Sequence, residues 1–139
     1  MINYQNLLNL VREVDDEFTP KLSQKTELTE FVTKALEKGH CIFENGETED
    51  LKGVVVGYAN DQYKRYSYIS LVAVGKKYRK QGVAKRLVKQ FVHYASSVPF
   101  IDIIGIHTNN PIALNMYLGL GFVTIEKKDQ RFYLEYRIR

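Results

Sequence analysis

A glycine lies among four cations in residues 78–87, "YRKQGVAKRL", between an apolar stretch and a segment with helical periodicity. Backbone N–H groups at the N-terminus of a helix are unpaired and carry the positive end of the helix dipole. Because Gly82 has no Cβ, a phosphate can approach these groups closely, and Arg79, Lys80 and Lys85 would add charge around it. The segment therefore predicts a phosphate or pyrophosphate site.

The distribution of charge favours an anionic ligand near this segment. Residues 1–50 hold 5 basic and 11 acidic side chains, whereas residues 51–139 hold 15 basic and 5 acidic ones. Seven of the cations lie between Lys76 and Lys89, which favours a local anion over a diffuse polyanion surface. No exposed aromatic residues interleave with them, so nucleic-acid binding is not expected. Arg86 and Lys89 are expected only to solvate the helix.

Several other classes of site do not fit the sequence. The Walker pattern and the dinucleotide-binding glycine pattern are both missing around Gly82. The single cysteine, Cys41, lies in the apolar stretch "HCIF", which favours a buried structural thiol, and we expect neither a disulfide nor a metal site. There is no run of 18 apolar residues and no basic, apolar leader, so we expect a cytoplasmic protein that does not associate with a membrane.

Periodicity predicts a single domain, residues 1–139, with a mixed α/β sheet of about six strands and about four helices in the order α-α-β-β-β-α-β-α-β-β. The first two helices are expected at 4–18 and 23–38. The first three strands are expected at 40–45, 51–60 and 66–74. An amphipathic helix from Val83 is followed by a strand at 100–108 and a short helix that Asn110 caps. A hairpin of residues 122–128 and 131–139 closes the chain.

Two motifs in this order resemble those of the GCN5-related N-acetyltransferases (GNAT). Residues 79–84, Arg-Lys-Gln-Gly-Val-Ala, match the family's pyrophosphate motif Gln/Arg-x-x-Gly-x-Gly/Ala. Residues 110–122 match its second signature, Asn-x-x-Ala-x-x-x-Tyr-x-x-x-Gly-Phe. The order of elements also fits, so the resemblance covers nearly the whole chain and implies a mostly antiparallel sheet.

The resemblance implies an acyltransferase that moves an acetyl group from acetyl-CoA to a primary amine by direct attack. The strands at 66–74 and 100–108 would part to admit the thioester, and a main-chain N–H near Ala73 would polarise its carbonyl. Strand residues would pair with the pantetheine arm, the glycine loop would hold the pyrophosphate, and Asn110 would touch the arm. The implied cofactor-binding residues are Val72, Ala73, Val74, Arg79, Lys80, Gln81, Gly82, Val83, Ala84, Lys85, Asn110 and Tyr117.

Tyr117 is the predicted proton donor. Direct attack expels a thiolate, and a phenol with a pKa near ~10 is protonated at neutral pH and can give that thiolate a proton. The alternative role of Tyr117 is a core aromatic packed on Ala113, one turn away.

The general base is not evident from the sequence. The two positions at which family members carry a glutamate are Gly105 and Tyr68 in this chain. Tyr68 and Ser70, predicted to share a face of their strand, are candidates to hold a water relay, and His107 is a weaker candidate. An alkylammonium has a pKa of about 10.4, so its proton must be removed, whereas a less basic amine would relax this demand.

The acceptor is expected to be a small-molecule amine, bound beside the acidic residues 15–17. The alternatives are a protein or peptide acceptor, at lysine or an N-terminal amine, and a CoA-binding module with weak catalysis. Homodimers are common in the family, so a second copy of the chain is a candidate partner. The sequence does not name the amine, the base, the oligomeric state or the length of the acyl group.

Overall fold

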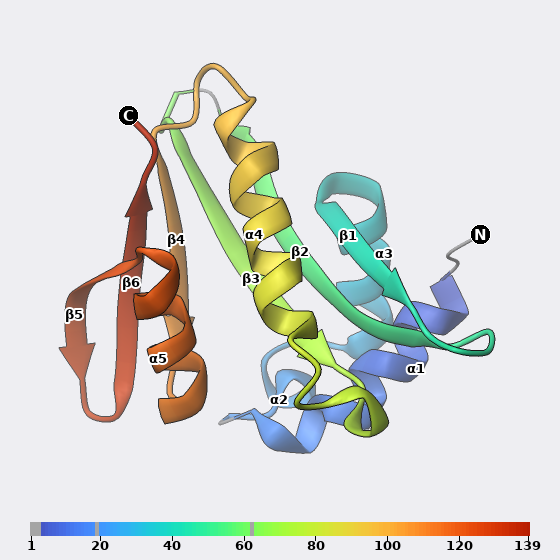
Figure 1. Ribbon diagram of the computed structural model, residues 1–139. Helices are drawn as coiled ribbons and strands as arrows, with labels where there is room; N and C mark the ends of the chain where they lie inside the picture. Colours follow the sequence, from blue (N-terminus) through green and yellow to red (C-terminus); the bar gives the residue numbers. More distant parts are fainter. Residues whose placement is uncertain (1–3, 19, 62) are drawn as a thin grey trace.

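The computed structural model describes residues 4–18, 20–61 and 63–139 (Figure 1). The helices are α1 (Tyr4–Val14), α2 (Leu22–Lys25), α3 (Leu28–Lys38), α4 (Val83–Ser96) and α5 (Pro111–Leu120), with 3-10 turns η1 (Asp15–Glu17) and η2 (Lys76–Tyr78). The strands are β1 (His40–Asn45), β2 (Leu51–Asp61), β3 (Tyr66–Val74), β4 (Ile103–Thr108), β5 (Val123–Lys128) and β6 (Arg131–Arg137). Within the described ranges, no helix has the length and apolar character needed to cross a bilayer.

The six strands form one sheet in the order β1-β2-β3-β4-β6-β5. Only β3 and β4 are parallel, and every other neighbouring pair is antiparallel. The predicted strand order along the chain and the mostly antiparallel character of the sheet are confirmed. A parallel pair needs a long crossover, and here α4 supplies it.

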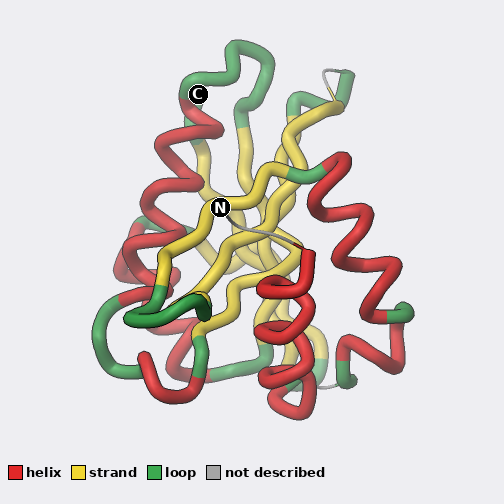
Figure 2. The backbone as a smooth tube through the Cα atoms, turned by 90° about the vertical axis from the view of Figure 1, so that its right-hand side faces the viewer, coloured by secondary structure: helices red, strands yellow, loops and turns green. Residues whose placement is uncertain are grey.

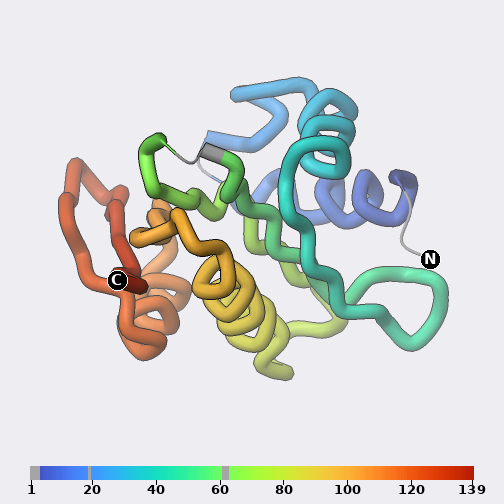
Figure 3. Tube along the Cα trace, turned by 90° about the horizontal axis from the view of Figure 1, so that it is seen from above, coloured from blue at the N-terminus to red at the C-terminus, as the bar shows by residue number. Residues whose placement is uncertain are grey.

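Helices cover both faces of the sheet and bury a separate core on each (Figures 2 and 3). Leu7 and Val11 of α1 and Val32 of α3 pack on one face, against β2 and β3. Leu87 and Phe91 of α4 pack on the other face, together with α5. Both cores rest on the 3.6-residue apolar spacing of the helices and the two-residue alternation of the strands.

The segment before β1 differs from the prediction. The expected helix at 23–38 is two helices, α2 and α3, because Thr26 is extended, with φ −156° and ψ 159°. The first helix ends at Val14 rather than at Phe18, and η1 follows it. Ser23, the predicted cap, instead donates its N–H and its hydroxyl to the Asp15 carboxylate, at 2.8 and 2.5 Å. This contact with Asp15, eight residues back along the chain, ties the start of α2 to η1.

The strands β3 and β4 run together and then separate. Their ladder extends only from Tyr66 opposite Ile103 to Ile69 opposite Ile106, although β3 continues to Val74. Figure 1 shows the two strands side by side at one end and apart at the other, near the starts of α4 and α5. This is the separation that the resemblance predicted. It leaves the β4-facing edge of β3 without a neighbouring strand beyond Ile69.

The close approach of α4 to β2 gives a test of this packing. A Cβ built on Gly57 would overlap the Phe91 ring, so Gly57→Val should lower the free energy of unfolding by about 1–3 kcal/mol in urea denaturation. Gly119→Ala is the control, since a Cβ there meets nothing within 4 Å on α5, and it should raise stability by up to about 1 kcal/mol. Equal stability of Gly57→Val and the parent protein would contradict this packing.

Candidate functional site

The predicted phosphate loop has the backbone geometry that an anion site needs. Gly82 is the N-cap of α4 in the left-handed region, with φ +76° and ψ 16°, and no side chain caps the helix there. Lys80 also has a positive φ, +63°. A side chain at Gly82 would be strained at this φ, and its Cβ would lie 3.2 Å from Nη1 of Arg86. The first N–H groups of α4 are therefore left for an external acceptor.

The loop residues divide into anchors and exposed groups. Val83 is buried in the core beneath α4, and Ala84 is half-buried. Lys80, Gln81 and Lys85 are exposed. The predicted contact of the 81–85 segment with a pyrophosphate thus depends on its backbone, with the two lysines available to add charge.

Arg79 holds the loop to the end of β3. Its Nε and Nη2 donate to the Val74 carbonyl at 3.1 and 2.9 Å, and Nη2 also pairs with Glu17 at 2.7 Å. These contacts neutralise part of its charge and occupy the Val74 oxygen. The role of Arg79 as a phosphate ligand stays a prediction.

Arg86 was wrongly expected only to solvate the helix. Its Nε and Nη2 bind the Glu44 carboxylate of β1 at 3.0 and 2.8 Å, and its Nη1 donates to the Gln81 carbonyl at 2.7 Å. The hydrogen bonds from Arg86 lower the pKa of Glu44. Arg86 thus links the glycine loop, at the Gln81 carbonyl, to Glu44 of β1. Nothing in the spacing of Glu44 and Arg86, 42 residues apart, could have paired them.

Tyr78 provides a second anchor for the loop. Its ring is buried, and its hydroxyl donates to the Asp50 carboxylate at 2.9 Å and accepts from the Glu47 N–H at 3.1 Å. The bond from Tyr78, with help from Lys77, lowers the pKa of Asp50 to about 2. The β1–β2 connection is therefore tied to η2, directly before the glycine loop.

Tyr117 has the core packing of its alternative role, and its role as proton donor stays a prediction. The residue is only 4% exposed, and its ring packs against Phe122 with centroids 5.7 Å apart. No described residue is hydrogen-bonded to its hydroxyl, and in the described ranges no fully buried side-chain polar atom lacks a partner. The hydroxyl therefore reaches solvent. Burial raises the pKa of Tyr117 above its ordinary value, so the phenol stays protonated at neutral pH.

Asn110 begins α5 as its sequence predicted. Its Oδ1 accepts the N–H groups of Ile112 and Ala113 at 2.8 and 3.2 Å, and Pro111 follows at the first helical position. The cap uses the side-chain oxygen of this exposed residue. A contact between Asn110 and a cofactor arm stays a prediction.

Polar side chains gather on the face of β3, β4 and β6 opposite α4 and α5. The Tyr68 hydroxyl lies 2.7 Å from Nδ1 of His107. The Tyr66 and Tyr133 hydroxyls are 2.6 Å apart, and Tyr133 donates to Glu135 at 2.8 Å. We call these five residues the polar cluster. Of them, Tyr66, Tyr133 and Glu135 were missed from the sequence, because strands far apart in the chain bring them together.

Ser70, expected to share a face with Tyr68, lies at a bulge in β3 and bonds to β2. The β2–β3 register shifts between Val56 and Gly57, and Ser70 has no partner there. Ile69 packs in the core beneath α4, whereas Leu71 packs in the core beneath α1, so the alternation of faces reverses at this bulge. The Ser70 hydroxyl donates to the Val56 carbonyl at 3.3 Å, apart from the polar cluster.

The surroundings of the His107 imidazole shift its pKa. Burial first, and then the charges of Arg131 and Lys25, lower its pKa below 6.5.

The acids at 15–17, expected beside the acceptor, are already paired: Asp15 with Ser23, Asp16 with Lys21 at 3.1 Å, and Glu17 with Arg79. Asp16 and Glu17 are thus in ion pairs and Asp15 is hydrogen-bonded, and their contact with an acceptor stays a prediction.

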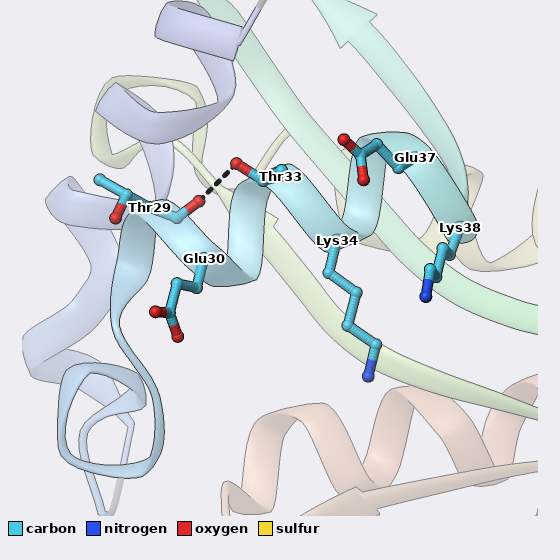
Figure 4. A pocket seen from close by; sticks show the side chains of 6 residues that line it. All are labelled: Thr29, Glu30, Thr33, Lys34, Glu37 and Lys38. Carbon is cyan, nitrogen blue, oxygen red and sulfur yellow. Dashed lines mark hydrogen bonds between the residues drawn. The ribbon is translucent and has the colours of Figure 1, made fainter.

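Two hollows lie outside this region. One follows the exposed side of α3, with all six lining residues on that helix and an internal bond from the Thr33 hydroxyl to the Thr29 carbonyl (Figure 4). The other lies between α1, residues 48–51 and η2.

No group of three or more His, Cys, Asp or Glu side chains arranged to hold a metal occurs among the described residues. The half-buried Cys41 donates to the Ala35 carbonyl, and burial raises its pKa to about 11.

The fold and the two motifs define an acetyltransferase domain. The profile of the acetyltransferase (GNAT) family matches residues 7–122, and the chain belongs to this family of acyltransferases. An N-alpha-acetyltransferase 30 from Xenopus laevis is 39% identical over 72 residues, about half of this chain. The chain spans about a quarter of that relative's length (26%).

Solved structures share the fold at low sequence identity. A GNAT-family acetyltransferase from Staphylococcus aureus Mu50 superposes with a TM-score of 0.76 at 16% identity, over 98% of this chain and 93% of that one. Aminoglycoside 6'-acetyltransferase type Ii gives 0.76 at 16% identity, over 98% and 90%. Arabidopsis thaliana NAA60, in complex with a bisubstrate analogue, gives 0.66 at 18% identity, over 93% and 92%.

The ion pair between Arg86 and Glu44 gives a test of two roles for Arg86. It can hold the loop in shape, or it can attract a phosphate directly by its charge. Glu44→Gln removes a negative charge, so simple electrostatics predicts tighter binding of a phosphate ligand. We expect the opposite, about tenfold weaker binding of acetyl-CoA by calorimetry, because Arg86 loses the partner that orients it on Gln81. Lys89→Gln, on the same helix, is the control and should change affinity by less than about twofold, as for other exposed charges. Tighter binding by Glu44→Gln would refute the supporting role.

Proposed function

We propose that this chain transfers the acetyl group of acetyl-CoA to the primary amine of a small molecule by direct attack. The observation that carries the proposal is the position of Gly82. Gly82 leaves the N-terminal N–H groups of α4 accessible. They lie beside the edge of β3 that has no pairing with β4 beyond Ile69. One end of an extended phosphate ligand fits the first feature, and its amide-containing arm fits the second.

The residues present fit acetyl-CoA. The backbone of Gln81 to Lys85 would hold the pyrophosphate, with Lys80 and Lys85 adding charge. Val72 and Ala73 lie beyond the last β3–β4 pair, so the backbone of this stretch is available to an arm lying along β3. When bound, acetyl-CoA supplies an activated acetyl thioester.

The chemistry assigned to the chain is proton transfer and orientation. Tyr117 gives its proton to the departing sulfur, and its burial-raised pKa keeps the phenol protonated until the thiolate forms. The Tyr68 hydroxyl, held by His107 at 2.7 Å, orients the amine or the water that accepts the amine's proton. A main-chain N–H near Ala73 polarises the acetyl carbonyl. The Ser70 hydroxyl donates to the Val56 carbonyl of β2, and we assign it no direct proton transfer.

The acceptor class rests on the shape of the polar cluster. Tyr68, His107 and Tyr133 present their polar groups close together, with the His107 and Tyr133 rings 4.8 Å apart. Such a compact set suits a small amine. A protein N-terminus is the second candidate, and the local 39% identity to an N-alpha-acetyltransferase favours it.

The proposal is tested by acetyl-CoA binding and by turnover. Acetyl-CoA should raise the melting temperature, and CoA release should accelerate with at least one of five acceptor classes: amino sugars, polyamines, aminoglycosides, amino acids and peptides. Gly82→Glu should abolish the thermal shift, because its side chain blocks the loop and repels phosphate. Gln90→Glu, which adds the same charge at an exposed site on α4 outside the loop, is the matched control and should keep the shift. The absence of any shift with the parent protein would sink the proposal, and turnover only with peptides would select the second acceptor class.

Tyr117→Phe separates proton donation from packing. The substitution keeps the ring that packs on Phe122 and removes only the solvent-reaching hydroxyl. We expect kcat to fall about 10²-fold, the usual value of a general acid, with the acetyl-CoA dissociation constant unchanged. Tyr94→Phe, on α4, is the control, since its ring stacks on His40 away from the polar cluster. An unchanged kcat in Tyr117→Phe would remove the proton donor from this scheme.

A further inference from the structure

Gly105 lies where family members place a glutamate, and other side chains fill the space that this glutamate would need. A Cβ built on Gly105 would overlap the Tyr66 hydroxyl and approach the Tyr133 hydroxyl at 2.6 Å. A glycine is therefore required here by its neighbours. The Tyr66 and Tyr133 hydroxyl oxygens occupy the position where the side chain of that glutamate would begin.

A carboxylate is nevertheless present beside Gly105. In the β4–β6 ladder, Glu135 is the direct partner of Gly105, and Tyr133 is the partner of His107. Directly opposed residues of an antiparallel pair lie on the same face of the sheet. Glu135 therefore lies on the face of Tyr66 and Tyr68, one strand away from the family position.

The hydrogen bonds give the chain of hydroxyls a direction. Tyr133 donates its only hydroxyl hydrogen to Glu135 Oε2 at 2.8 Å, and a carboxylate can only accept. In the 2.6 Å contact between the two phenols, Tyr66 must then be the donor. The Tyr66 oxygen keeps lone pairs with which to accept a proton from outside. All three groups are poised to pass a proton toward Glu135.

We propose that Tyr66, Tyr133 and Glu135 form the proton relay that replaces the family glutamate, with Glu135 as the final acceptor. This inference rests on the proposed function. The substrate ammonium gives a proton to Tyr66, Tyr66 gives its own to Tyr133, and Tyr133 gives its own to Glu135. The free amine then forms the C–N bond as the C–S bond breaks and sulfur takes the Tyr117 proton. The nitrogen loses its second proton to restore Tyr117, and Glu135 releases the first to water.

The hydrogen-bond connections of the relay favour Glu135 over His107 as the acceptor. The groups that face the relay are Tyr68 from β3, His107 from β4, Glu126 from β5, Arg131 and Arg137 from β6, and Lys25 from α2. Protonation of His107 would add a cation beside Arg131 and Lys25. Glu135 is linked to Tyr66 through the Tyr133 hydroxyl, whereas the hydrogen bond of His107 goes to Tyr68.

The relay is tested with two small amines that fit any acceptor site. Methylamine is protonated at neutral pH and needs a base, whereas hydroxylamine is largely unprotonated and does not. With methylamine, Glu135→Gln and Tyr66→Phe should each lower kcat at pH 7 by about 10²-fold. The double variant should fall no further, because the groups act as one chain. With hydroxylamine, after subtraction of the enzyme-free rate, all three variants should stay within about threefold of the parent protein.

The pH dependence and a matched control separate the relay from structural damage. Raising the pH should restore Glu135→Gln with methylamine, since solvent then deprotonates the amine. Glu37→Gln, at an exposed site on α3, is the control and should match the parent with both amines. Equal loss with both amines, or no loss with either, would overturn the relay. If the parent protein does not bind acetyl-CoA, or binds it but acetylates neither these amines nor any of the five acceptor classes, the proposed function fails instead.

Discussion

The separation of β3 from β4 is the constraint on which the rest of this structure depends. Parallel pairing holds the strands together up to Ile69 and Ile106, and beyond that point β3 keeps only β2 as a neighbour. Unpaired backbone groups must find partners, so the free edge of β3 is a ready site for an extended, amide-containing ligand. The same separation places the starts of α4 and α5, with Gly82 and Asn110, at the two sides of the opening.

The basic segment shows how a concentration of charge can be mostly structural. Arg79 is bound to Val74 and Glu17, and Arg86 is bound to Glu44 and Gln81. These arginines shape the loop, while Lys80 and Lys85 remain exposed to meet a ligand. Gly82, in the left-handed conformation, leaves the N-terminal N–H groups of α4 accessible to a ligand, which the cationic side chains do not do. The acidic N-terminal segment supplies some of the balancing partners, which explains the opposite charges of the two parts of the chain.

Prediction from the sequence succeeded where a local pattern carries the information. The strands, the amphipathic α4, the Asn110 cap and the glycine loop were all placed from spacing and residue type. It failed where a distant contact decides. Ser23 binds Asp15 instead of capping the expected helix, and the bulge at Ser70 reversed the faces of β3. The partnership of Arg86 with Glu44 left no trace in the local pattern.

The sequence by itself determined the family, the glycine loop and the tyrosine of α5, because each depends on residues within one short segment. Only the tertiary structure decided which groups stand together on the open face of the sheet. Glu135 meets Gly105 because β6 pairs antiparallel with β4 in one particular register, and a shift of one residue would turn that carboxylate to the opposite face. Register is set by the packing of whole strands, with Leu134 and Ile106 fully or nearly buried beneath the helices, and no single segment encodes it.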